Sequence, residues 1–164
     1  MKGGRLKVVK ILRSDKAAIF WTLIRLYLAW NWLKAGWNKI TGKFDISGFL
    51  DDAIKNTIGD HPSVLSWYAT FLDRFVLPNI DLFNLIVPWG EVFVGLGLIL
   101  GMFTTVSLLA GVFMNLNFIL AGAVSPNLTF FTLSVILLLM GPASYRFGFD
   151  YYFWPKIKEL FFQN

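Results

Sequence analysis

The chain has 164 residues, of which 56% are hydrophobic, 18% are aromatic and only 15% are charged. Soluble domains carry about 25% charged residues, so this composition excludes an ordinary soluble domain and predicts one integral membrane domain over residues 1–164. The lack of cysteine excludes disulfides, thiolate metal ligands and a dithiol redox centre. The net charge of +5 gathers near the N-terminus, which favours a role in membrane topology over nucleic-acid binding.

The first apolar run begins directly after a basic head, residues 1–16, and forms a predicted membrane helix over about residues 17–38. The run is too long for the apolar region of a signal peptide, and no A-x-A-like cleavage site follows it, so we expect it to be retained. Basic residues remain on the cytoplasmic side of bacterial-type inner membranes, which predicts a cytoplasmic N-terminus and a plasma-membrane location.

Polar residues of this first helix fall on two faces at 3.6 residues per turn. One face is a polar stripe that consists of Tyr27, Asn31, Lys34 and Asn38. The other face carries Arg25 in register with Trp32, Gly36 and Lys39. Lys34 and Lys39 could extend their side chains to the membrane interface. Arg25 lies about 12 Å from the cytoplasmic end at 1.5 Å per residue, so we expect it to face the bundle or a wet cavity.

Residues 40–83 form a polar, mostly acidic segment that we place outside the membrane. Apolar residues recur in it at helical spacing around residues 46–54 and again around residues 64–76, which predicts two amphipathic helices that cap the outer mouth of the bundle. His61, the only histidine, precedes a proline in the intervening turn. A solvated loop role is favoured for it, and no metal site is predicted.

Residues 92–145 carry no charged side chain, so this stretch must cross the bilayer more than once. Breaks near residues 102–105 and 125–127 divide it into predicted helices over about residues 84–102, 105–124 and 128–145. Residues 149–163 are rich in aromatic residues and predict an interfacial segment. The predicted fold is therefore an all-α, polytopic membrane protein: a four-transmembrane-helix bundle with both termini in the cytoplasm.

Glu91 is the one carboxylate inside the predicted spans, and such a residue marks a functional site by default. It lies about 10 Å from the outer end of its helix at 1.5 Å per residue, and the same estimate places Asn31 and Asn117 in its layer. Glu91 is a candidate proton acceptor or substrate anchor, with Lys34 as the partner of an anion. In the alternative, Glu91 pairs with Lys34 or Arg25 and the asparagines only hold helices together. Trp30 and Trp89 lie near enough to line a pocket for a flat ring.

Several motifs together resemble the DoxX family, and in particular its DoxD-like branch, the large subunit of thiosulfate:quinone oxidoreductase. The matching residues lie between about residues 20 and 150 and form five groups: Arg25; the A-G-x-x-K residues Ala35, Gly36 and Lys39; the loop residues Trp67, Tyr68 and 76–79; the glycine-rich Gly90, Glu91, Gly95, Leu98 and Gly101; and the ending Gly141, Pro142 and Asp150.

This resemblance implies a four-helix membrane fold and oxidation of thiosulfate to tetrathionate, with electrons passed to a membrane quinone. It implies that Lys34, Lys39 and Arg25 attract the anion and that Glu91 handles protons, with Asn31, Asn38 and Asn117 lining the site. Two alternatives stay open: a non-catalytic scaffold that anchors a soluble redox partner, and a module that binds a small solute or lipid. The expected partners are the bilayer, a second redox subunit and a further copy of the chain.

Overall fold

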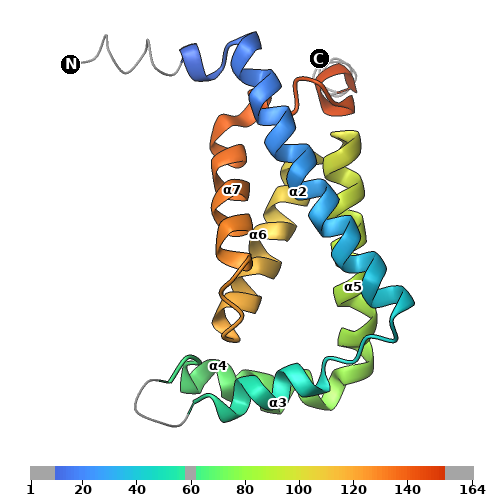
Figure 1. Ribbon diagram of the computed structural model, residues 1–164, viewed down its shortest axis with the longest axis vertical. Coiled ribbons are helices and arrows are strands. Elements are labelled where there is room, and N and C mark those ends of the chain that lie inside the picture. Colours follow the sequence, from blue (N-terminus) through green and yellow to red (C-terminus); the bar gives the residue numbers. More distant parts are fainter. Residues whose placement is uncertain (1–9, 58–61, 154–164) are drawn as a thin grey trace, which may run out of the picture.

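The computed structural model describes residues 10–57 and 62–153, and the regular secondary structure of this part of the chain is all helical (Figure 1). The elements follow one another as α2 (Asp15–Thr41), α3 (Ser47–Lys55), α4 (Ser66–Phe71), the π-helical turn η1 (Leu72–Val76), the 3₁₀ turn η2 (Leu77–Asn79), α5 (Ile80–Leu100), α6 (Thr104–Leu120), α7 (Asn127–Met140) and the 3₁₀ turn η3 (Gly141–Ser144).

Four long helices, α2, α5, α6 and α7, pack side by side, and the short helices α3 and α4 lie across one end of this bundle (Figure 1). The predicted helices at about 17–38, 84–102, 105–124 and 128–145 are confirmed as helices, with shifts of a few residues at their ends. Two continuous helical stretches, 66–100 and 127–144, are long and apolar enough to cross a bilayer, and α6 is a shorter apolar helix. Four membrane crossings therefore remain a prediction.

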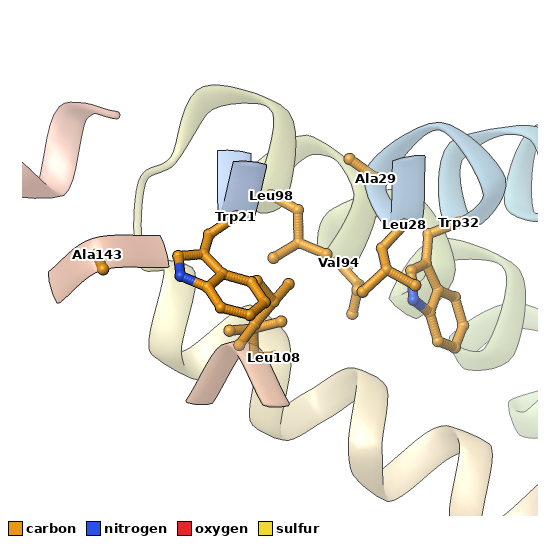
Figure 2. Close-up of a cluster of buried hydrophobic side chains, with 9 residues drawn as sticks. Trp21, Leu28, Ala29, Trp32, Val94, Leu98, Leu108 and Ala143 are labelled. Carbon is orange, nitrogen blue, oxygen red and sulfur yellow. The ribbon is translucent and has the colours of Figure 1, made fainter. Parts of the chain in front are cut away.

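The core of the bundle is a cluster of large apolar side chains contributed by all four long helices (Figure 2). Trp21, Leu28 and Trp32 of α2 meet Val94, Leu98, Leu108 and Leu137 of the other three. The outward-facing residues are also apolar, and Phe93, Phe113 and Leu139 are each exposed over most of their surface. A surface of this kind suits a hydrocarbon solvent and indicates a membrane protein.

A second apolar cluster joins the layer of α3 and α4 to the end of the bundle. Ile46, Leu50, Val64, Tyr68 and Leu72 are buried in it, as the helical spacing predicts. The chain enters α3 through Asp45, whose carboxylate accepts hydrogen bonds from Ser47 N and Ser47 Oγ and whose pKa is lowered mainly by the backbone bond. The predicted cap over one mouth of the bundle is confirmed as an arrangement of helices.

Three predicted features lie wholly or mostly outside the described residues. These are residues 1–9 of the basic head, the turn that holds His61, and residues 154–163 of the C-terminal segment. Residues 149–153, at the start of that last segment, are helical and lie at the same end of the bundle as the beginning of α2 (Figure 1).

Candidate functional site

Lys39 and Glu91 form an ion pair between α2 and α5 near the end of the bundle that α3 and α4 cover. Lys39 Nζ lies 2.6 Å from Glu91 Oε1 and 2.7 Å from Oε2, so one ammonium donates to both carboxylate oxygens. Glu91 is 2% exposed, whereas the Lys39 side chain is 26% exposed. A carboxylate buried this deeply requires a paired cation, and Lys39 supplies it.

Two glycines bring α2 and α5 close enough for this pair to form. A methyl group on Gly36 of α2 would come within 2.7 Å of Pro88 O and Val92 Cγ2. A methyl group on Gly95 of α5 would come within 2.6 Å of Leu33 Cγ. Neither position can hold a larger residue without moving the helices apart. Gly36 and Gly95 are therefore points of close contact between the two helices.

A cavity of about 290 Å³ adjoins the ion pair. Its wall combines the two charged groups with the amides Asn31 and Asn127 and with mostly aromatic and apolar side chains, which include Trp32, Phe44, Ile46, Phe49, Phe118 and Phe130. Lys39 Nζ also lies 5.5 Å from the centre of the Phe44 ring and 5.9 Å from that of Phe118, within the range of cation–π attraction. A mostly apolar cavity with a few convergent polar groups is the usual form of a small-molecule site.

The structure brings only part of the predicted site together. Glu91, Lys39 and Asn31 line the cavity, but Lys34 and Asn38 are exposed on the outer surface of α2. The prediction that Lys34 is the partner of Glu91 is wrong. The face of α2 that packs inward carries Arg25, Trp32 and Gly36, and Lys39 continues this face one turn beyond Gly36.

Of the residues that the structure describes, those in the wall of the cavity do not include Trp30 or Trp89. Trp30 is 65% exposed and Trp89 is 44% exposed, with its ring beside that of Phe93 on α5. Both side chains point to the surface that we assign to lipid, so the predicted ring pocket between them is not formed. The tryptophan in the wall of the cavity is instead Trp32, which is 4% exposed.

Arg25 lies at the other end of the bundle, fourteen positions before Lys39 and so about 21 Å from it along α2. It is almost completely buried, and its Nη2 donates to Phe147 O at 3.0 Å. Its guanidinium also abuts Gly101 and Gly148. Arg25 therefore ties α2 to the α5–α6 turn and to the segment after α7, and it does not reach Glu91.

Asn117 lies near the site but is engaged in joining helices. Its Oδ1 accepts from Tyr68 Oη at 2.9 Å, and its Nδ2 donates to Phe113 O at 2.8 Å. The amide thereby anchors α4 to α6. This contact agrees with the alternative in which the asparagines hold helices together, rather than with substrate binding by Asn117.

Further buried polar groups lie on the inner faces of α2, α6 and α7, and among them the sequence interpretation passed over Asn115. Trp32 Nε1, both side-chain atoms of Asn115, and Ser134 Oγ are buried without a hydrogen-bond partner among the described residues. Trp32 Nε1 lies 3.5 Å from the position of a methyl group on Gly111, one turn before Asn115. Small or polar residues recur at helical spacing in α6, at positions 104, 107, 111 and 115. This spacing is the sequence pattern that could have predicted the inner face of α6.

The apolar outer surface, the long apolar helices and the ion pair enclosed between them define a helical membrane protein. The DoxX family model matches residues 20–124, from the first turns of α2 to the end of α6, and the chain belongs to the DoxX family. Comparison with curated proteins gives no match, and comparison with solved structures gives no match either.

Proposed function

We propose that this chain is the membrane subunit of a quinone-linked redox system, of the DoxD-like type that oxidises thiosulfate, and that the cavity beside Lys39 and Glu91 receives the quinone head group. The observation that supports this proposal is the cavity itself. It places an acid and a cation in the wall of a mostly aromatic and apolar space.

The proposed membrane arrangement has four crossings, by α2, α5, α6 and α7, in the plasma membrane. The even number of crossings puts both termini on one side, and the excess of basic residues before α2 favours the cytoplasm for that side. The layer of α3 and α4 then lies on the outer side. The cavity beside Glu91 adjoins that layer, because Ile46 and Phe49 contribute to its wall.

The chemistry assigned to the two residues follows from their charges. Oxidation of two thiosulfate ions to tetrathionate releases two electrons, and reduction of a quinone to a quinol takes up two electrons and two protons. Glu91 would pass protons to a ring oxygen, and Lys39 would stabilise negative charge that develops on that oxygen. The electrons would arrive through a second redox subunit, and the proposed assembly also allows a further copy of this chain.

The decisive experiment measures quinone reduction by the purified chain, with its redox partner, in lipid nanodiscs. We expect thiosulfate to drive reduction of a short-chain benzoquinone, followed by its absorbance. Glu91→Gln should lower this rate by about 100-fold, the loss typical of removing a general acid or base. Asp51→Asn, which neutralises an exposed acid on α3, should leave the rate unchanged. A folded Glu91→Gln variant with full activity would contradict the proton role.

A non-catalytic scaffold is the second candidate, because Lys39 and Glu91 already satisfy each other. A scaffold needs no ligand in the cavity. Titration of the wild-type chain with the same benzoquinone, followed through quenching of tryptophan fluorescence, separates the two candidates. Saturable quenching supports the quinone site, whereas a linear response identical to that of empty nanodiscs supports the scaffold.

A further inference from the structure

A second cavity, of about 320 Å³, lies beneath the layer of α3 and α4 and is almost entirely apolar. Its wall is built from α3, α4, η1, α5 and α6, and Phe71, Phe75, Phe83 and Phe113 contribute aromatic rings to it. We call this space the apolar chamber. Its volume is at the lower end of the range of about 300–1,000 Å³ typical of ligand sites.

The apolar chamber and the cavity beside the ion pair share part of their walls. Ile46, Phe49 and Phe118 line both spaces. The rings of Phe49 and Phe118 meet edge to face, with their centres 6.4 Å apart. Phe118 also lies beside Lys39 Nζ. The two spaces are therefore neighbours that share these three side chains.

The polar groups in the wall of the apolar chamber are already paired. Tyr68 Oη donates to Asn117 Oδ1 at 2.9 Å, and Asn117 Nδ2 donates to Phe113 O at 2.8 Å. A polar ligand group placed here would lose its hydrogen bonds to water without finding new partners. The chamber thus favours hydrocarbon, whereas the neighbouring cavity offers the charged and polar groups.

Exposed apolar side chains in the wall give the apolar chamber a lateral opening. Phe75 is 55% exposed and Phe113 is 67% exposed, although both line the chamber. Ile86 of α5 is exposed in the same way. On a membrane protein such side chains face lipid, so a hydrocarbon chain can enter from the bilayer without crossing water.

We propose that the apolar chamber binds the hydrocarbon tail of the same molecule whose head group lies beside Lys39 and Glu91. The ligand is thus an amphiphile: a flat polar ring that carries an alkyl or prenyl chain. This inference rests on the proposed quinone function and adds to it a tail-binding site under α3 and α4. A phospholipid acyl chain has the same hydrocarbon chemistry and is the competing source.

The test compares two quinones with the same ring, one without a tail and one with a ten-carbon tail. Binding to the chain in nanodiscs is followed by quenching of tryptophan fluorescence. Val87→Phe of α5 and Ala121→Leu, after α6, each place additional atoms in the chamber from a different segment. Val106→Phe adds a ring on the exposed surface of α6, away from the chamber, and is the matched control.

We expect each filling variant to lower the affinity ratio of tailed to tailless quinone by about tenfold or more, while the affinity for the tailless quinone changes less than about twofold. Partition of the tailed quinone into lipid affects all variants alike and cancels in this comparison. Val106→Phe should keep the wild-type ratio. An unchanged ratio in the folded filling variants would overturn the proposal, and use of two segments guards against the failure of one variant to fold.

Two further results separate the possible failures. If the wild-type chain does not bind the tailless quinone, the proposed function fails, whatever the chamber holds. If the tailless quinone binds, but the filling variants change only the amount of phospholipid that copurifies with the chain, the chamber is an acyl-chain site and the tail proposal fails by itself.

Discussion

Lys39 and Glu91 show how one pair of side chains determines the character of the whole cavity. Separation of a buried carboxylate from its cation is costly in a low-dielectric interior, and the 2% exposure of Glu91 leaves little water to compensate. Lys39 is partly exposed, so its long side chain connects the interior to the solvated end of the bundle. The pair is therefore both a structural link between the helices and the charged part of the cavity wall.

Replacement of Lys39 by methionine tests the structural part of this role. We expect Lys39→Met to lower the free energy of unfolding by about 3 kcal/mol, because Glu91 is left buried without its cation. Lys34→Met, on the exposed face of the same helix, should change it by less than about 0.5 kcal/mol. Unfolding in mixed detergent micelles, followed by circular dichroism, provides the measurement.

Neutralising both partners completes this test. In the double variant with Lys39→Met and Glu91→Gln neither charge of this pair remains buried, so most of the lost stability should return. An equal loss in the Lys39 and Lys34 variants would show that the ion pair contributes nothing to stability.

At the scale of the helices, the contact between α2 and α5 places Lys39 at Glu91. Gly36 and Gly95 are interlocked: each lies where the backbone or side chain of the other helix leaves no room for a methyl group. This close approach fixes the rotation of α2 about its axis. A rotation by one residue position is about 100°, which is enough to turn Lys39 away from α5 and another side chain toward it.

Gly36→Ala tests this interlocking. We expect it to lower the free energy of unfolding by about 2 kcal/mol, since the new methyl group meets Pro88 O, Val92 N and Val92 Cγ2, and two of these atoms are backbone. Gly48→Ala is the matched control, because its methyl group meets nothing within 4 Å on α3. That change should stabilise the chain by about 0.5–1 kcal/mol.

The same pair of variants can be compared in the quinone titration. Gly36→Ala should weaken binding as well as folding, because it moves Lys39 relative to Glu91, whereas Gly48→Ala should bind as the wild type does. Identical stability of the two alanine variants would contradict the assignment of Gly36 as a point of close contact between the helices.

At the scale of the molecule, both ends of the bundle are closed, each in its own way. One end is covered by α3 and α4 with their own apolar cluster. At the other end, Asp150 links the segment after α7 to the start of α6. Its Oδ1 accepts from Phe103 N at 2.8 Å, and its Oδ2 accepts from Thr104 N at 2.7 Å. This carboxylate, far along the chain, caps the start of α6, and Arg25 binds Phe147 O beside it.

Asp150→Ala should therefore loosen the end of the bundle opposite the cavity. Loss of two hydrogen bonds from a charged cap predicts a decrease of about 2 kcal/mol in the free energy of unfolding. Amide hydrogen exchange should rise at residues 103–107 while the amides near Glu91 stay protected. Asp52→Ala, an exposed acid on α3, is the control. Unchanged exchange at the start of α6 would refute the capping role.

Local sequence patterns alone predicted the helices and the membrane class. The helices were expected close to where they lie, because long apolar runs and the breaks between them depend only on neighbouring residues. The breaks are those near residues 102–105 and 125–127. The motif glycines and Glu91 were likewise recognisable, because a small residue or an acid within an apolar helix needs a close contact or a partner.

Only the tertiary structure decided which residues meet. The candidate cations for Glu91 were Lys34 and Arg25, and positions along the helix could not show that Lys39 is the residue that pairs with it. The choice depends on the rotation and height of α2 against α5, which the packing of Gly36, Gly95 and the buried tryptophans of α2 determines jointly. The tertiary packing also places Asn117 where it accepts a hydrogen bond from Tyr68. It places Arg25 at the far end of the bundle, where Arg25 donates to Phe147 O. The apolar chamber, walled by five elements, has no local signature in the sequence.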